Sequence, residues 1–347
     1  MFEHEGLQLF ADLLVPSPSG REWAVADLVR TEVEALGYKH ETDGAGNVLV
    51  RLNGRSETAP LCCLASHMDE IGMTVTKILP DGRLRVTRSG GLLPWKLGEG
   101  PVELLGDKKN IVAILSMGST HTATRQGAVT WDDVHLLTGL SPAQLKEAGV
   151  RPGTTAVPTR EQRGPVLFGD SADPMVAAWT FDDRLGCVTL LRLLRWLKEN
   201  GQQPHHPTLV AFTTQEEVGG HGAKWVANKH QPEIFVAVDG SPIPPETDLV
   251  LDGRPAIWSK DRLVHYDQRL LADFCAAAER VGTELQTAVF NSAASDASLV
   301  SYAGLAPRIA CMGQVRENSH GYEVARLSVF DNMLQTLVEF VISGASE

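Results

Sequence analysis

Apolar residues recur with two different spacings along the chain. Before about residue 72 and after about residue 168, stretches with helical spacing alternate with short apolar runs typical of buried strands. Such a pattern favours a mostly parallel sheet covered by helices on both faces. Predicted helices cover residues 6–15, 22–36, 185–199, 223–229, 267–281, 296–302 and 327–342. Predicted strands cover residues 38–42, 48–52, 59–65, 207–213, 234–238, 255–259, 285–290 and 306–312. Ser19 is predicted to cap the second helix.

The middle of the chain has a different texture. Residues 73–167 show strand-like alternation, many glycines and valines, and one predicted helix over 142–148. We therefore expect an α/β domain, formed by residues 1–72 and 168–347, that is interrupted by a small β-rich domain over residues 73–167. The length of 347 residues is consistent with one large domain carrying an insertion.

The composition indicates which binding partners are excluded and in which cellular compartment the protein is expected. The formal net charge of -12 argues against nucleic acid and anionic membranes as partners, because both require basic surfaces. The five cysteines form no Cys-x-x-Cys pair, which indicates a reduced, cytoplasmic protein. The amino-terminal residues have no signal-peptide pattern, and no apolar run has the length of a membrane span.

Metal-ligating residue types stand at the ends of several predicted strands. His67 comes just after the apolar run over 59–65, and Asp69 follows two residues later. If the strand continues through them, both side chains lie on one side of the pleat. An imidazole can bind a metal ion, and the neighbouring carboxylate can orient it. Further ligand-type residues follow later strands or open a helix: Glu216, Glu217, Asp239, His320 and Asp182.

Each of these residues has an ordinary interpretation when taken alone. Asp182 or Asp183 could cap a helix, Asp239 could open a turn, and the other three could be solvated. Ligands of open α/β sheets bind beyond the carboxyl ends of the strands, however, so these five positions, with Glu216 and Glu217 counted as one, are expected to meet at one edge. Two histidines and three carboxylates, one of them bridging, can hold two divalent ions with a water between them.

The adjacent glutamates can divide two roles. One can bind metal, and the other can act as a general base that takes a proton from the activated water and returns it to a leaving amine. Two neighbouring carboxylates also raise the pKa of one of them, which suits a proton shuttle. Residue spacing leaves both assignments open.

The ordered motifs resemble metallopeptidase family forty-two, the glutamyl/leucyl aminopeptidase group that includes the tetrahedral (TET) aminopeptidases. The motifs span most of the chain and comprise residues 66–72 (Ser-His-Met-Asp-Glu-Ile-Gly), 181–186 (Phe-Asp-Asp-Arg-Leu-Gly), 215–219 (Gln-Glu-Glu-Val-Gly), 238–239 (Val-Asp) and His320 with Glu323. The resemblance implies a zinc-exopeptidase-like α/β/α domain with an inserted PDZ-like domain. It also implies two divalent ions per subunit, with zinc or cobalt preferred and manganese accepted.

The resemblance also implies a role for each site residue. His67 and Asp239 would bind one ion, Glu217 and His320 the other, and Asp182 would bridge them. Glu216 would be the general base, and Asp69 would orient His67. Related deacylases and carboxypeptidases share this order of motifs, but their extra domain follows the glutamate pair. Here the long insertion falls between His67 and Asp182, which favours the aminopeptidases.

Two loops depart from the family pattern. Asp239 is followed by Gly-Ser-Pro rather than by a threonine-containing segment, and residues 317–322 read Glu-Asn-Ser-His-Gly-Tyr where an aromatic-Ile-His-Ser run is usual. Because both loops are expected on the substrate side, the departures bear on specificity more than on the metal site.

The expected function is therefore that of a cytoplasmic metallo-aminopeptidase. It would remove amino-terminal residues from short peptides, with the water between the ions attacking the scissile carbonyl and Glu216 carrying the proton. A homo-oligomer, up to a dodecamer, is expected from the resemblance. Two alternatives remain open: an N-acyl amino-acid deacylase or carboxypeptidase on the same scaffold, and an inactive metal-binding protein with a structural or interaction role.

Overall fold

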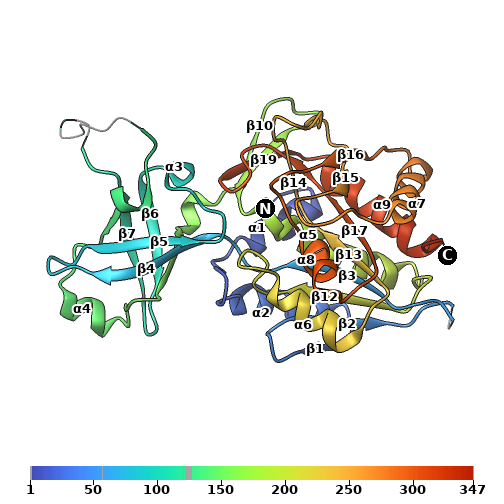
Figure 1. The fold of residues 1–347 in the computed structure, drawn as a ribbon, viewed down its shortest axis with the longest axis horizontal. Helices are drawn as coiled ribbons and strands as arrows, with labels where there is room; N and C mark the ends of the chain where they lie inside the picture. Colours follow the sequence, from blue (N-terminus) through green and yellow to red (C-terminus); the bar gives the residue numbers. More distant parts are fainter. Residues whose placement is uncertain (1, 57, 120, 122–126, 347) are drawn as a thin grey trace.

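The computed structural model describes residues 2–56, 58–119, 121 and 127–346. A larger α/β part and a smaller β part lie side by side (Figure 1). The chain passes from the larger part into the smaller one after β3 and returns before β10. The larger part is thus assembled from the two ends of the sequence.

An eight-stranded sheet forms the centre of the α/β part. Its order is β1 (His40–Thr42), β2 (Val48–Leu52), β12 (Thr208–Thr213), β3 (Cys62–His67), β13 (Ile234–Val238), β17 (Arg308–Gly313), β15 (Ala256–Lys260) and β16 (Gln286–Val289). The four central strands β12, β3, β13 and β17 are parallel, and β15 is parallel to β16. Antiparallel pairs join β1 to β2, β2 to β12 and β17 to β15. The carboxyl ends of the four central strands therefore share one edge.

Helices cover both faces of this sheet. Alternate residues of β3 point to opposite faces, so Leu64 belongs to one buried cluster and Cys63 to another. The first face packs on α1 (Glu5–Leu13), α2 (Trp23–Ala35), α5 (Phe181–Glu199), α7 (Gln268–Arg280) and α9 (Val329–Ser343). The second face packs on α6 (His221–His230) and α8 (Asp296–Tyr302). The predicted α/β/α layering is confirmed.

The β part is a closed barrel with a core of its own. Its strands, in order around the barrel, are β4 (Gly72–Ile78), β5 (Leu84–Ser89), β8 (His135–Leu137), β7 (Asn110–Ser116), β6 (Gly100–Leu105) and β9 (Thr155–Pro158). The short helices α3 (Pro94–Leu97) and α4 (Pro142–Glu147) and the 3-10 turn Trp131–Asp133 lie between strands. Met73, Val86, Leu104 and Leu136 are buried together inside. Closure leaves no free sheet edge among these strands.

The returning chain adds a small sheet to the α/β part. After a 3-10 turn at Arg160–Gln162, β10 (Val166–Phe168) pairs with β11 (Met175–Trp179), which pairs with β19 (Tyr322–Arg326). A two-stranded pair joins β14 (Ser241–Pro242) to β18 (Val315–Arg316). The expected boundary between residues 167 and 168 falls inside β10. Because β10 pairs with β11 rather than with a barrel strand, we propose two domains whose second crossing lies earlier, between Pro158 and Val166.

One local prediction is wrong. Ser19 does not cap the second helix, because α2 begins after Glu22 and has no side-chain cap. The Ser19 hydroxyl instead donates to Asp69 Oδ2 over 2.7 Å. The Ser19 hydroxyl, which local spacing predicted as a helix cap, is therefore bonded to Asp69, 50 residues away in the sequence.

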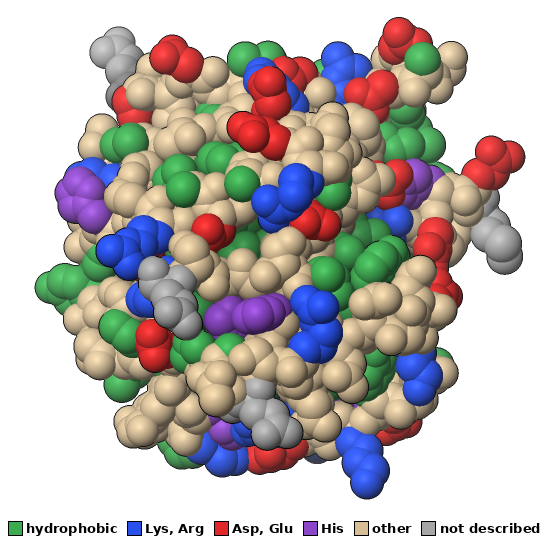
Figure 2. Space-filling view, turned by 90° about the vertical axis from the view of Figure 1, so that its right-hand side faces the viewer, with side chains coloured by type: hydrophobic (Ala, Val, Ile, Leu, Met, Phe, Trp, Pro, Cys, Tyr) green, Lys and Arg blue, Asp and Glu red, His purple; other side chains and the backbone are tan. Residues whose placement is uncertain are grey.

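Two further features concern the surface charge and the length of the apolar helices. The lysine and arginine side chains on the face turned away from the barrel are interspersed with aspartate and glutamate (Figure 2). Among the helices of the described residues, none is both long and apolar enough to cross a membrane.

Candidate metal centre

Three neighbouring strands bring candidate ligands to one edge of the sheet. His67 is the last residue of β3 and pairs in register with Thr213, the last residue of β12. Glu216 and Glu217 follow β12 within a few residues, and Asp239 follows β13 directly. Because these strands are parallel neighbours, the residues that follow them are close in space.

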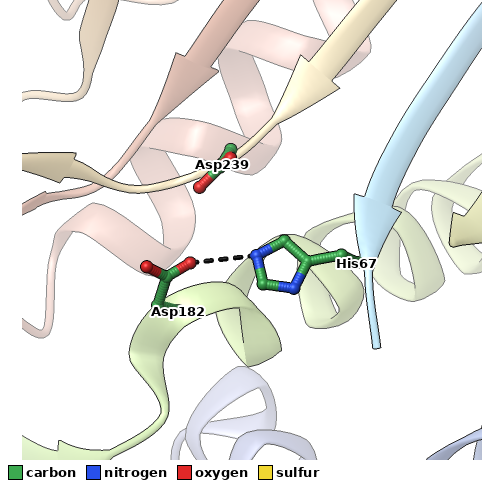
Figure 3. Close-up of side chains that lie close together, drawn as sticks. All are labelled: His67, Asp182 and Asp239. Carbon is green, nitrogen blue, oxygen red and sulfur yellow. Dashed lines mark hydrogen bonds and ion pairs between the residues drawn. The ribbon is translucent and has the colours of Figure 1, made fainter. Parts of the chain in front are cut away.

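Asp182 reaches the same place from the start of α5. Its backbone and that of Asp183 are non-helical, and Thr180 just before them has a φ of 69°. His67 Nε2 lies 3.0 Å from Asp182 Oδ1. Figure 3 shows His67, Asp182 and Asp239 converging from β3, α5 and the end of β13. Left-handed backbone at a non-glycine residue is costly, and such residues cluster at functional sites.

The five predicted ligands fall into two groups that share one residue. His67, Asp182 and Asp239 form one group, and Asp182, Glu217 and His320 form the other, with the ligand atoms of each group within 4.8 Å of one another. His320 Nε2 lies 3.5 Å from Asp182 Oδ2 and 3.9 Å from Glu217 Oε2. Asp182 therefore stands where a bridging carboxylate would stand.

Two observations indicate that these residues can bind divalent cations: the types of ligand atom, and a buried carboxylate oxygen that has no hydrogen-bond partner in the described part of the chain. Two imidazoles and three carboxylates suit zinc, cobalt or manganese. Glu217 Oε1 is buried and has no hydrogen-bond partner among the described residues. Burial raises the pKa of Glu217 to about 8 and that of Asp239 to about 7, and in both cases the Asp182 carboxylate adds to the rise. A cation held there would supply the missing positive charge.

Arg316 was not predicted as a site residue. It ends β18, is buried, and its guanidinium contacts Asp182 Oδ2, while its Nε lies 2.8 Å from Glu323 Oε1. Burial raises the pKa of Asp182, but Arg316 and the two histidines outweigh it and hold that pKa well below its usual range. A single arginine beyond a strand gives no distinctive sequence signal, because most arginines are exposed.

Glu323 holds the late loop in place. Its carboxylate accepts from the backbone N–H of Asp182 over 3.0 Å and from that of His320 over 3.1 Å. His320 itself has a φ of 59°. The loop that departs from the family pattern thus adopts a left-handed turn that directs His320 toward Asp182.

Asp69 links the His67 strand to the glutamate pair. Its Oδ1 lies 3.3 Å from His67 Nδ1 and accepts from the N–H of Glu216 over 2.9 Å, and its Oδ2 accepts from the N–H of Glu217 over 3.3 Å. The backbone carbonyl of Asp69 also lies 3.1 Å from His67 Nδ1. One buried residue therefore contacts the imidazole through its carbonyl and its carboxylate, and its carboxylate also holds the turn that carries Glu216 and Glu217.

Glu216 faces a cleft of about 680 Å³ that the two parts of the chain line together. Burial raises the pKa of Glu216 well above its usual range; His67 opposes the rise, and the carboxylates of Asp296, Asp239 and Glu217 add to it. The barrel side contributes Gly91, Leu93 and Lys96 to the lining, and the α/β part contributes Trp258, Arg262 and Phe290. A carboxyl group with a raised pKa in a cleft can give and take protons near neutral pH.

Fold and site together define an α/β protein with a two-part histidine–carboxylate centre at the carboxyl edge of its sheet. The family model described as M42 glutamyl aminopeptidase matches residues 46–335, and the chain belongs to this family. The resemblance inferred from the motifs is confirmed.

Individual relatives agree with this assignment. The glutamyl aminopeptidase of Lactococcus lactis is 29% identical over 66% of this chain, and the match spans 64% of the Lactococcus protein. An aminopeptidase structure from the archaeon Desulfurococcus kamchatkensis is 25% identical with a TM-score of 0.87, covering 98% of this chain and 95% of that one. The TET1 peptidase of Pyrococcus horikoshii has the same fold, with a TM-score of 0.85, 24% identity and coverage of 98% and 99%.

Proposed function

We propose that this protein is a metal-dependent aminopeptidase that hydrolyses the amino-terminal bond of short peptides. The observation that carries the proposal is the pair of ligand groups sharing Asp182 beside a cleft that Glu216 lines. His67 and Asp239 would hold one ion, Glu217 and His320 the other, and Asp182 both. Zinc or cobalt is the proposed metal, with manganese as a further candidate. Two such ions would polarise the scissile carbonyl and acidify water.

The chain's own residues supply the proton transfer. Glu216 would take a proton from the attacking water and deliver it to the amine that leaves. Its raised pKa supports a carboxyl group that holds the proton between these two steps. Asp69 would keep Glu216 in place through the backbone contact described above, and would orient His67.

The test of the mechanism is Glu216→Gln. The variant should retain its metal ions by elemental analysis, while kcat falls by about two to four orders of magnitude, because the proton shuttle is lost. The wild-type protein and the variant are assayed on aminoacyl anilides and on N-acetyl amino acids. Near-wild-type turnover of Glu216→Gln with its ions in place would refute the mechanism. Preference for N-acetyl amino acids would point to the deacylase, and two bound ions without any hydrolysis would point to the inactive alternative.

Two cationic side chains support a preference for substrates that carry a carboxylate. Lys96 and Arg262 line the cleft, and within the described residues neither forms an ion pair. The acidic residues that line the cleft are the proposed metal ligands and Glu216. Lys96 and Arg262 are therefore free to bind a charged group of the substrate. The carboxylate could belong to an acidic side chain or to the carboxyl terminus of a short peptide.

Matched substrates distinguish these two sources. A glutamyl anilide is compared with a leucyl anilide, and Leu-Leu with Leu-Leu-amide. Arg262→Gln or Lys96→Gln should reduce the discrimination for the carboxylate that the cation binds by about ten- to a hundredfold, as expected for a charge-assisted hydrogen bond. Equal discrimination in the wild type and both variants would refute the proposal.

We further propose that the chain works as a cytoplasmic homo-oligomer, up to a dodecamer in size. The apolar side chains of Val112, Ile114 and Leu137 on the barrel are 62%, 43% and 42% exposed, which supports association. The TET1 peptidase of Pyrococcus horikoshii can assemble into a tetrahedron or a large octahedral shell, which makes self-assembly of this fold a precedent. The five free cysteines support a reducing compartment. Light scattering of the purified protein measures the subunit number.

A further inference from the structure

The two crossings between the α/β part and the barrel lie side by side and are joined by a buried ion pair. Glu70 stands just before β4, on the outgoing crossing, and Arg163 stands between β9 and β10, on the returning one. Arg163 donates from one terminal nitrogen to Glu70 Oε2 over 3.0 Å and from the other to Oε1 over 3.1 Å. Both side chains are fully buried.

Glu70 is also held by two donors of the α/β part. The backbone N–H of Ser17 donates to Oε1 over 2.7 Å, and Trp179 Nε1 donates to Oε2 over 2.7 Å. Trp179 ends β11, yet its ring packs in the hydrophobic cluster of the barrel, and its backbone N–H donates to the carbonyl of Arg163 over 2.9 Å. One carboxylate therefore binds four donors from three separate segments, and one of those segments reaches into the barrel core.

Stability alone is a weak reason for such an arrangement. Burying a carboxylate and a guanidinium costs desolvation that their attraction repays only in part, and apolar replacements of similar volume are often as stable. What a bidentate, fully hydrogen-bonded pair provides is a defined relative geometry of the groups it joins. Here those groups are the two crossings and the strand that leads to the site.

Glu70 and Trp179 stand close in the sequence to residues of the candidate centre, and the barrel touches the centre from its other side. Glu70 follows Asp69, which holds the glutamate turn, and Trp179 precedes Asp182 by three residues. On the barrel side, the segment between β5 and α3 touches the site, because a Cβ placed on Gly91 would lie 2.4 Å from His320 Nδ1. A small rotation of the barrel would therefore move Gly91, Leu93 and Lys96 against the ligands.

We propose that Glu70, with Arg163 and Trp179, is a positioning clamp that sets the barrel wall of the cleft against the metal centre. Its role is to align the part of a peptide substrate that touches the barrel wall, and no chemical step passes through it. The inference rests on the proposed aminopeptidase function for its kinetic readout and has a second readout that is independent of activity.

The experiment compares Glu70→Gln with Glu70→Gln/Arg163→Met and uses Asp81→Asn as the matched control. Asp81 forms an exposed ion pair with Arg83 in the turn between β4 and β5 of the barrel. In Glu70→Gln, KM for a tripeptide should rise about ten- to a hundredfold, with kcat, metal content and KM for an aminoacyl anilide changed much less. The double variant should regain part of the thermal stability, because the charge of Arg163 no longer stays buried without its partner, whereas Arg184, 3.8 Å from Glu70 Oε1, still loses an ion pair. It should keep the high KM.

Two kinetic results would overturn the clamp. One is an equal loss on the tripeptide and the anilide; the other is a double variant in which KM recovers together with thermal stability, as a purely structural pair would allow. Where Glu70→Gln does not fold, Trp179→Phe removes a single donor and keeps an aromatic ring, and the same KM-against-kcat pattern is expected.

Hydrogen–deuterium exchange gives the readout that does not need activity. Backbone amides of residues 90–97 should exchange faster in Glu70→Gln than in the wild type or Asp81→Asn, because the barrel wall is less firmly held. Unchanged exchange there would refute the clamp even in an active enzyme. Changed exchange in a protein that hydrolyses no peptide would leave the clamp standing and refute the aminopeptidase proposal instead.

Discussion

At the scale of single residues, the candidate centre depends on two glycines, because neighbouring side chains occupy the space that a Cβ atom would need. Gly240 lies against Arg316, since an added Cβ would sit 1.1 Å from a terminal guanidinium nitrogen. Gly91 lies against His320 in the same way. Gly240 thus lets the backbone approach the buried guanidinium of Arg316, and Gly91 lets a barrel loop reach His320 in the candidate centre.

Gly91→Ala should weaken metal binding at the Glu217–His320 half of the centre. The added methyl group would displace the His320 ring, and disturbing the support of a ligand typically lowers metal affinity about ten- to a hundredfold. Gly44→Ala is the control, because the new Cβ would meet only the exposed ring of Trp225, at 3.3 Å. Metal content after dialysis against a graded chelator measures the effect. Equal retention of both ions in the two variants would contradict it.

At the scale of elements, three helices meet at one carboxylate. Asp331, in the first turn of α9, accepts from Arg192 of α5 over 2.8 Å and lies 3.3 Å from His4 Nε2, at the amino-terminal cap of α1. The hydrogen bond with His4, together with Arg192, lowers the pKa of Asp331 to about 2. A carboxylate at a helix amino terminus is also favoured by the helix dipole.

This contact should stabilise the fold only where Asp331 is ionised. Because the folded-state pKa is lowered, the stabilisation is present above the unfolded-state pKa of about 4 and is lost as the pH falls toward about 2. At pH 6, the free energy of unfolding of Asp331→Asn should therefore be lower than that of the wild type by less than about 1 kcal/mol, because the carboxylate is half-exposed and screened. Thermal unfolding measures the difference. The gap should narrow as the pH falls below about 4 and should close as the pH approaches about 2. A gap that is independent of pH would contradict this account.

At the scale of the whole molecule, the candidate ligands come from five separate segments. His67 ends β3, Asp182 opens α5, and the other three ligands follow β12, β13 and β18. All of these elements except β3 lie after the barrel in the chain. Ions at this edge would cross-link strands and loops that no disulfide joins, since all five cysteines are free. Metal binding should therefore be coupled to the stability of the α/β part.

Removal of metal should lower the unfolding temperature reversibly. Ligands that bind only the folded state stabilise it by about 2.7 kcal/mol at a hundred times Kd, so zinc or cobalt returned to the chelated protein should restore the loss. Differential scanning calorimetry of the chelated and the reloaded protein measures the change, and Glu216→Gln should behave like the wild type. Identical unfolding temperatures with and without metal would argue against ligands drawn from five segments.

The sequence by itself determined much of this protein. The apolar periodicity predicted the helices and strands of the α/β part, because strand and helix periods are local properties of the chain. It also predicted which residues follow strand ends, and parallel strands must then bring His67, Glu217 and Asp239 to one edge. The ordered motifs were enough to place the chain in its family.

Only the tertiary structure decided which charged groups are buried together. Three contacts show this: Arg316 pairs with Asp182, Ser19 donates to Asp69, and Glu70 pairs with Arg163. The partners are far apart in the sequence, and local spacing had assigned Ser19 to a helix cap instead. The closure of the barrel and the pairing of β10 with β11 were likewise absent from the pattern. Period and composition report what a residue prefers on average, whereas a buried charge is set by the particular partner that long-range packing brings within hydrogen-bonding distance.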